Sequence, residues 1–323
     1  MTNVVEVKNL HVRFGGDRTV HAVNDVSLTV GQGEVLGLLG ESGSGKSVTL
    51  RALMRLLPKH KTTITGSIKV NGSDVLAMGD EELSAFRGQT TSMIFQEPGL
   101  ALDPVYTIGD QIAESVMRHK GVSKADGMAR ALQMLEVVRI PSAKRRLESY
   151  PHEMSGGMRQ RAMIALALAC EPKVLLADEP TTALDATVQI QILLLLRELQ
   201  REFGMSVIFV THDIGVAIEI CDRVAVMYAG QIVETGTMRE IVRSPVHPYP
   251  KGLLASTVHG AERGSRLGTI PGAPPSLSTA PDSCSFAPRC SNAQPQCVEK
   301  LPPVVQMGPE RVVRCVLAAE TVT

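Results

Sequence analysis

One stretch of the sequence decides the fold, Gly40-Glu41-Ser42-Gly43-Ser44-Gly45-Lys46-Ser47. It satisfies the phosphate-loop pattern, in which a glycine is followed after four residues by Gly-Lys and then Ser or Thr. The apolar run 34–39 before it predicts a buried strand, and we expect a helix to begin at Lys46. Glycines let successive backbone N–H groups point at phosphate oxygens, and the helix N-terminus adds a partial positive charge. The stretch therefore predicts a site for the phosphates of a nucleotide.

The residues of this loop have separate expected roles. Lys46 supplies a positive charge for the phosphates, and the Ser47 hydroxyl is a ligand for Mg²⁺. The residues predicted to bind nucleotide here are Gly40, Ser42, Gly43, Ser44, Gly45, Lys46, Ser47 and Val48. The alternative is an ordinary glycine-rich turn, but the pattern and its strand–loop–helix context point independently to phosphate binding.

A second motif is a pair of acidic residues after a strand. The apolar run 174–177 predicts a strand buried on both faces, and Asp178 and Glu179 follow it directly. Ligands bind at the carboxyl ends of strands in open α/β sheets. Asp178 is expected to hold Mg²⁺ through its water shell, and Glu179 to act as general base on the attacking water. An acidic pair alone is more often a solvated turn, but the phosphate loop favours the catalytic interpretation.

The rest of the chain alternates strands and helices, which indicates a layered α/β fold. Beyond the acidic pair we expect a helix at 188–203, a strand at 206–210, a helix at 214–221 and a hairpin of strands 223–228 and 231–235. Residues 99–147 have helical spacing and few strand signals, which predicts a helical insertion. From about residue 236 the sequence is rich in Pro, Ser and Gly, and we expect a separate, loop-rich tail.

Composition excludes several functions. Thirty-three basic and 33 acidic residues give a net charge of zero, and aromatic residues are only 3% with no Trp. Nucleic-acid binding is therefore disfavoured, because it needs positive charge and stacking surfaces. No apolar run approaches the roughly 20 residues that cross a bilayer, and the N-terminus lacks a signal-peptide pattern. We therefore expect a soluble protein that is not secreted by that route.

Further motifs identify a family. They are Met154-Ser155-Gly156-Gly157-Met158-Arg159-Gln160-Arg161, Gln96 after an expected strand at 91–95, the loop Thr182-Ala183-Leu184-Asp185, and His212 after the strand 206–210. Each has a simpler explanation by itself, such as a helix cap, a surface amide or a structural histidine. Together with the phosphate loop and the acidic pair, they occur in one order from about residue 5 to 236. In this the chain resembles the ATP-binding subunits of ABC transporters.

The resemblance implies a fold and a division of the chain. The implied fold class is α/β, a phosphate-loop NTPase core of ABC ATPase type with a helical subdomain and a loop-rich C-terminal extension. Residues 1–98 and 152–236 would form the core, residues 99–151 the helical subdomain, and residues 237–323 the extension. The helical subdomain would be the docking face for a helix of each transmembrane partner.

The resemblance also implies a role for each motif residue. Glu179, His212 and Gln96 would be catalytic: His212 would contact the γ-phosphate, and Gln96 the magnesium ion or the attacking water. The implied magnesium ligands are Ser47, Gln96 and Asp178. Gln96 would in addition sense the transmembrane partner.

Other implied contacts concern adenine and a second protomer. Phe14 lies where this family stacks an aromatic ring on adenine. Ser155, Gly156 and Gly157 would cap the γ-phosphate bound to the other protomer, and Asp185 would cross the dimer interface. The common signature ends in Gln where this chain has Met158, which resembles the peptide-importer branch, and we still expect hydrolysis.

Four cysteines lie close together in the tail: Cys284, Cys290, Cys297 and Cys315. Their spacing matches neither the short pairs of structural zinc sites nor bacterial ferredoxins, so spacing alone leaves metal-free thiols equally open. The tail as a whole resembles the C-terminal extension of dipeptide and oligopeptide importer ATPases, which implies a structural [4Fe–4S] cluster, with zinc as the alternative metal. If the tail is separate, replacing Cys284 and Cys290 by Ser should leave nucleotide affinity nearly unchanged.

The implied function is that of a subunit that binds and hydrolyses ATP to energise an importer for dipeptides or oligopeptides. Its partners would be a second, non-identical ATP-binding subunit, two transmembrane permease subunits and an extracytoplasmic solute-binding protein, at the cytoplasmic face of the inner membrane; no nucleic acid is implied. ATP-driven closure of the dimer would be transmitted to the permeases. The alternatives are an importer for a nickel complex, glutathione or an opine, or a soluble ABC ATPase acting on DNA or ribosomes. A coiled coil or second cassette typical of the latter is absent from the sequence.

Overall fold

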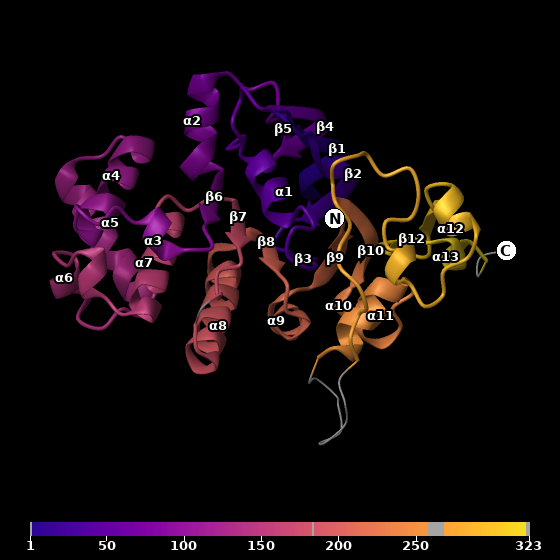
Figure 1. Ribbon diagram of the computed structural model, residues 1–323. Helices are drawn as coiled ribbons and strands as arrows, with labels where there is room; N and C mark the ends of the chain where they lie inside the picture. Colours follow the sequence, from indigo (N-terminus) through magenta and orange to yellow (C-terminus); the bar gives the residue numbers. More distant parts are fainter. Residues whose placement is uncertain (1, 183, 258–267, 321–323) are drawn as a thin grey trace. The chain divides into compact units, whose positions relative to one another are not determined.

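The computed structural model describes residues 2–182, 184–257 and 268–320 (Figure 1). These residues divide into two compact units. The first unit comprises Met1–Val4, Gly31–Gly33 and Ala77–Ile208, and the second comprises Val5–Val30, Glu34–Leu76 and Phe209–Thr323. Within the predicted C-terminal extension, residues 258–267 and 321–323 lie outside the described residues.

The first unit contains parallel strands. Strand β6 (Thr91–Ile94) pairs with β7 (Val174–Asp178), with Thr91 opposite Val174. All residues of β7 are buried, as a strand covered on both faces requires. Strand β8 (Ser206–Thr211), the neighbour of β7, begins in this unit and ends in the second. Strands β6, β7 and β8 lie where the sequence predicts strands, at 91–95, 174–177 and 206–210.

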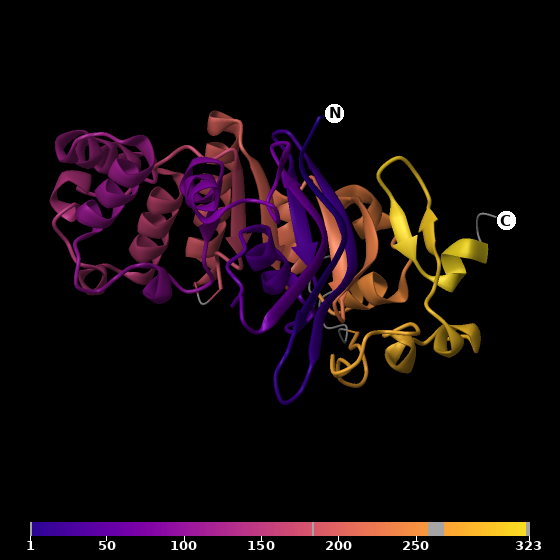
Figure 2. The same cartoon turned by 90° about the horizontal axis from the view of Figure 1, so that it is seen from above.

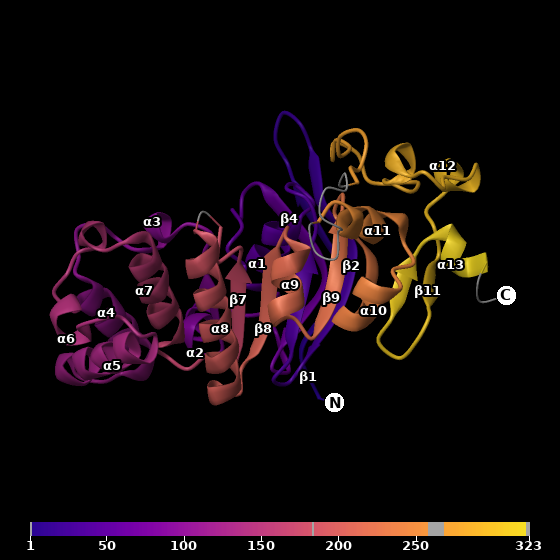
Figure 3. The same cartoon turned by 90° about the horizontal axis from the view of Figure 1, so that it is seen from below.

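Helices make up most of the first unit. They are α2 (Asp80–Gln89), α3 (Pro98–Ala101), α4 (Ile108–Lys120), α5 (Lys124–Val137), α6 (Ala143–Arg146), α7 (Gly156–Leu168) and α8 (Ala186–Phe203), with the short 3₁₀ turn η1 (Pro151–Glu153). Helix α5 packs against α4 and α7 (Figure 3). The side chains of Thr107 and Ser123 cap α4 and α5, so these helices begin where hydroxyl groups accept the first N–H groups. The predicted helical insertion thus forms α3 to α6.

The second unit has an antiparallel sheet with the strand order β2-β1-β4-β5. Figure 2 shows its indigo strands from above. Its strands are β1 (Asn3–Phe14), β2 (Val20–Gly31), β4 (Thr62–Val70) and β5 (Ser73–Asp74). Val5, Val7, Leu10 and Val12 of β1 are fully or almost fully buried, while the residues beside them are half-buried or exposed. This alternation is what a sheet with one covered face produces.

A second group of strands holds the phosphate loop. Strand β3 (Val35–Leu39) is parallel to β9 (Arg223–Tyr228), and β9 forms a hairpin with β10 (Gln231–Thr237). The hairpin turns at Ala229 and Gly230, which have φ angles of 46° and 79°. Two residues with positive φ match the twist of the flanking strands, and the hairpin predicted at these residues is confirmed.

The C-terminal residues extend this sheet. Strand β12 (Val312–Arg314) pairs with β10, and β11 (Val304–Gln306) pairs with β12. The helices of this unit are α1 (Lys46–Leu53), α9 (Ile214–Ile220), α10 (Met238–Arg243), α11 (Pro248–Ala255), α12 (Gln296–Glu299) and α13 (Val316–Glu320), with the turn η2 (Ala287–Arg289). The tail therefore shares a compact unit with the phosphate loop, in contrast to the separate unit expected. Among its described residues, two apolar clusters each contain three buried side chains, which is a small core for a segment of this length.

Buried polar groups join the tail to β10. Glu234 is fully buried, and its carboxylate accepts hydrogen bonds from the backbone N–H groups of Val246 and His247 and from Arg311. Burial lowers the pKa of His247 to about 3, so its ring is neutral, and Nδ1 accepts a hydrogen bond from the Tyr249 N–H. These contacts satisfy the backbone where α11 begins.

Candidate nucleotide-binding site

The phosphate loop lies between β3 and α1, as predicted. Lys46 is 4% exposed, and its Nζ donates hydrogen bonds to the carbonyl oxygens of Gly40 at 2.8 Å and Glu41 at 2.9 Å. A Cβ atom at Gly40 would lie 2.1 Å from the Met227 oxygen, and one at Gly45, where φ is 101°, would lie 2.4 Å from the Ala22 oxygen. Only glycine fits these two positions, because the loop is packed closely against neighbouring backbone.

The loop has groups that suit a phosphate ligand. Within the described residues, the buried Ser44 Oγ has no hydrogen-bond partner, a condition that usually points to an absent ligand or water. The N-cap of α1 is Gly45, and no side chain caps this helix. Its first N–H groups therefore remain suited to an anion. Ser42 and Gly43 are exposed at the tip of the loop, and Ser47 and Val48 are half-buried in the first turn of α1.

Two further predicted residues belong to the same unit. His212 is exposed directly after β8, and the next residue, Asp213, caps α9 by accepting a hydrogen bond from Gly215 at 2.7 Å. His212 lines a cavity of about 540 Å³ together with Leu253 of α11. Phe14 is half-buried at the end of β1, opposite Thr62. The roles of Phe14 and His212 remain predictions.

The acidic pair belongs to the first unit. Asp178 is 1% exposed at the end of β7, and Glu179 follows with a φ of 46°, an uncommon value for a residue other than glycine. Glu179 Oε2 accepts hydrogen bonds from Gln96 Nε2 at 3.3 Å and from Thr182 Oγ1 at 3.0 Å. The structure thus brings Gln96 and Glu179 into contact, and their catalytic roles remain predictions. The sequence pattern predicts Thr182 only as part of a loop, and its contact with Glu179 appears only in the structure.

The signature residues begin α7. Ser155 caps this helix by accepting a hydrogen bond from the Met158 N–H at 3.3 Å, and Ser155 and Gly156 are exposed. Asp185 caps α8 in the same way through the Val188 N–H at 2.9 Å. A Cβ atom at Gly157 would lie 3.0 Å from Val188, so the starts of the two helices are neighbours. Ala183, which belongs to the predicted loop before Asp185, lies outside the described residues.

The four tail cysteines are free thiols that lie near one another. Burial raises the pKa of Cys284, and the thiols of Cys297 and Cys315 raise it further. Burial also raises the pKa of Cys315, again with a contribution from Cys290 and Cys297. The Cys284 N–H donates to the Cys297 carbonyl at 2.9 Å. Among the described residues, no group of three or more His, Cys, Asp or Glu side chains is arranged to hold a metal ion. The structure therefore gives the predicted iron–sulfur cluster and the zinc alternative no direct support.

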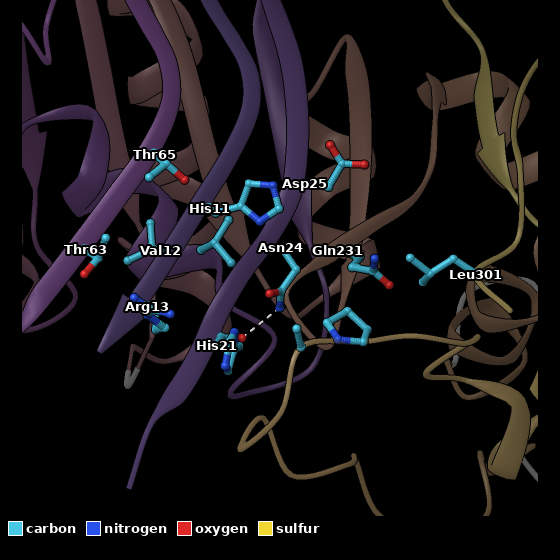
Figure 4. Close-up of a pocket in the computed structure, with 13 residues that line it drawn as sticks. His11, Val12, Arg13, His21, Asn24, Asp25, Thr63, Thr65, Gln231 and Leu301 are labelled. Atoms are coloured by element: carbon cyan, nitrogen blue, oxygen red, sulfur yellow. Dashed lines mark hydrogen bonds between the residues drawn. The ribbon is translucent and has the colours of Figure 1, made fainter. Parts of the chain in front are cut away.

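Another cavity, of about 440 Å³, lies beside the antiparallel sheet of the second unit (Figure 4). Its lining includes His11, Arg13 and His21 from the sheet and Leu301 from the tail. The Asn24 side chain, also in the lining, donates a hydrogen bond to the His21 carbonyl at 2.8 Å. Among the described residues, neither Phe14 nor a phosphate-loop residue lines this cavity.

A glycine-rich loop between a parallel strand and an uncapped helix, with a buried lysine and an unpaired buried hydroxyl, defines a phosphate-loop nucleotide-binding protein. The family described as "ABC transporter" matches residues 23–182, and the family described as "Oligopeptide/dipeptide transporter, C-terminal region" matches residues 233–297. The chain belongs to the family of ABC transporter ATP-binding proteins, in its oligopeptide/dipeptide branch.

Relatives and solved structures agree with this assignment. The oligopeptide transport ATP-binding protein OppD of Salmonella typhimurium is 50% identical over 275 residues, which are 85% of this chain and 82% of the relative. The dipeptide transport ATP-binding protein DppD of Bacillus subtilis is 50% identical over 281 residues, 86% of this chain and 83% of the relative. A dimeric, post-hydrolysis ATP-binding cassette with bound ADP and phosphate has a TM-score of 0.65 and 31% identity over 73% of this chain and 99% of its own. The predicted family and fold class are confirmed. No described helix is both long and apolar enough to cross a membrane.

Proposed function

We propose that this chain binds and hydrolyses ATP and thereby powers an importer for dipeptides and oligopeptides. One observation carries the proposal. The chain matches both the ABC transporter family and the C-terminal region of oligopeptide/dipeptide transporters. A relative named for oligopeptide transport is 50% identical to it over 85% of its length. ATP hydrolysis follows from the cassette itself, and the C-terminal region supports the peptide as the transported solute.

The predicted site residues supply the steps of hydrolysis. Lys46 and the N–H groups of the phosphate loop hold the phosphates, and Ser47 and Asp178 would hold Mg²⁺, which neutralises phosphate charge when bound. Glu179 accepts a proton from the attacking water, and Gln96 orients that water or contacts the ion. His212 contacts the γ-phosphate, and Phe14 stacks on adenine. The buried Ser44 hydroxyl without a partner supports a ligand at this loop.

A second ATP-binding subunit would complete the site. Ser155, Gly156 and Gly157 present the start of α7 to the γ-phosphate held by the partner, and Asp185 lies at the same interface. Ser155, Gly156 and Asp185 are exposed in this chain and Gly157 is half-buried, which supports that role. We propose a non-identical partner ATPase, two permease subunits that dock on the helical subdomain, and an extracytoplasmic solute-binding protein. The complex would place this chain on the cytoplasmic face of the inner membrane, without nucleic acid.

Reconstituted transport tests this proposal. The chain, the partner ATPase and the permeases are placed in proteoliposomes with the binding protein, and uptake of labelled dipeptides, pentapeptides, glutathione and a nickel chelate is compared. ATP-dependent uptake of the peptides alone is expected. Uptake of only glutathione or nickel would replace the peptide proposal with another solute. ATPase activity that responds to DNA or ribosomes but not to the permeases would contradict a transport role.

We also propose that Cys284, Cys290, Cys297 and Cys315 hold a [4Fe–4S] cluster with a structural role. The mutual electrostatic influence of these thiols supports this, since all four lie in one small region. A cluster takes thiolates spread over several irons, so its ligands need not converge on one point as around a single ion.

Metal analysis of anaerobically purified protein tests the cluster. About four iron and four sulfide per chain, with broad visible absorption, are expected. Replacing Cys284 and Cys290 together by Ser should abolish both, while Cys170→Ser, a buried thiol of the first unit, should leave them unchanged. Zinc in place of iron, or protein without metal, would contradict the cluster and leave the ATPase proposal intact.

A further inference from the structure

A residue of the tail forms a strong ion pair with the phosphate loop. Arg289 Nη1 and Nη2 donate hydrogen bonds to the two carboxylate oxygens of Glu41, at 2.7 Å and 3.1 Å. The Arg289 side chain is 6% exposed and that of Glu41 is 26% exposed. A two-pronged, largely buried contact of this kind has fixed geometry and is stronger than a surface ion pair.

The tail contacts the same loop residue at a second point. The backbone N–H of Glu41 donates a hydrogen bond to Tyr249 Oη at 2.9 Å. Inside the loop, the Glu41 carbonyl accepts from Lys46 Nζ and from the Ser44 N–H. The side chain and the N–H group of Glu41 therefore bind the tail, while its carbonyl group binds Lys46, the predicted phosphate-binding lysine, and Ser44.

Arg289 is itself held rigidly. Its Nε donates to the Pro271 carbonyl at 2.8 Å, its Nη1 lies 3.3 Å from Tyr228 Oη, and its guanidinium carbon is 5.7 Å from the centre of the Tyr228 ring. The rings of Tyr228, Tyr249 and Phe286 pack on one another with centres 4.7 to 5.3 Å apart. Because these contacts leave the guanidinium few alternative positions, it can hold the Glu41 carboxylate in one conformation.

Charge gives this pair a consequence for the ligand. Glu41 is a carboxylate inside a loop that is built for a polyphosphate anion, and an unneutralised negative charge there would repel the ligand. Arg289 neutralises it, and the same contact orders the loop before the ligand arrives. Ordering in advance lowers the free-energy cost of binding.

We propose that Arg289 and Tyr249 are positioning residues for ATP binding, which couple the four-cysteine segment of the tail to the phosphate loop. This inference rests on the proposed ATPase function. Arg289 immediately precedes Cys290, and Phe286 lies between Cys284 and Cys290. Nucleotide affinity then depends on the tail, which reverses the expectation from the sequence that the two are independent. By linkage, nucleotide binding also stabilises this segment.

The test measures binding of the non-hydrolysable analogue AMP-PNP with Mg²⁺ to the full chain by calorimetry, together with steady-state ATPase kinetics. Arg289→Ala should raise Kd and KM for the nucleotide about tenfold, the value of one charge-assisted hydrogen bond, while kcat at saturating ATP changes less than about threefold. Tyr249→Phe, which keeps the ring packing, should raise Kd about threefold. Adding Glu41→Gln to Arg289→Ala should restore most of the affinity, because the uncompensated charge is removed.

A matched control separates this role from attachment of the tail. Arg314 pairs with Asp25 on β2 at 2.7 Å, and not with Glu41, so Arg314→Ala should weaken the tail's attachment without raising Kd. An unchanged Kd in Arg289→Ala, an equal rise in Arg314→Ala, or no rescue by Glu41→Gln would each overturn the proposal. If Arg289→Ala does not fold, the Tyr249→Phe result decides. A wild-type chain that fails to bind AMP-PNP would instead overturn the proposed ATPase function.

Discussion

Replacing Glu179 by Gln is expected to lower the rate of ATP hydrolysis by about 100-fold or more, while ATP affinity changes less than about twofold. The carboxylate is the proposed general base, and an amide of the same size cannot accept the proton. Glu179 is held by Gln96 and Thr182, and Gln keeps the size and most of these contacts. Single-turnover hydrolysis and equilibrium binding of ATP measure the two quantities separately.

A control at the other end of the same strand makes this result specific. Glu171 precedes β7, is exposed, and forms an ion pair with Arg130. Glu171→Gln should retain wild-type turnover, because an ion pair made by an exposed carboxylate contributes little and Glu171 has no proposed role in the chemistry. If the Glu179→Gln variant hydrolyses ATP at the wild-type rate, Glu179 is not the general base.

Replacing Lys46 by Met is expected to weaken ATP binding by about 100-fold. Met fills the buried space of the lysine stem but has no charge for the phosphates and no donor for the Gly40 and Glu41 carbonyls. The loop therefore loses both a ligand for the phosphates and two internal hydrogen bonds. Calorimetric titration with Mg²⁺-ATP measures the effect, and thermal unfolding shows whether the fold is retained.

Lys69→Met is the matched control for this change. Lys69 is exposed on β4 in the same unit, where it lies opposite Glu6 of β1 and Asp74 of β5 in the sheet. Lys69→Met lowers the net charge of the chain by one, as Lys46→Met does, but it changes no residue of the phosphate loop. ATP affinity should therefore stay within about twofold of wild type. Equal losses in both variants would indicate that overall charge, and not the position of Lys46, governs binding.

Local patterns were enough to predict most elements of the core. The run before the phosphate loop is β3, the run before the acidic pair is β7, and the hairpin turns at Ala229 and Gly230 as expected. The helix at 188–203 is α8, which begins two residues earlier, at Ala186, because Asp185 caps it. These elements depend on residues close in sequence, where apolar period, glycine and capping side chains act directly.

The sequence by itself determined the family, the α/β fold and the motifs of the nucleotide site, because each motif is a short run whose chemistry is local. Only the tertiary structure showed that Glu179 is held by Gln96, 83 residues away, and that Arg289 pairs with Glu41 across 248 residues. It also showed β12 of the tail pairing with β10. Such contacts have no periodic signal in the chain, since they arise when folding brings distant segments together to bury apolar surface and pair the charges left inside.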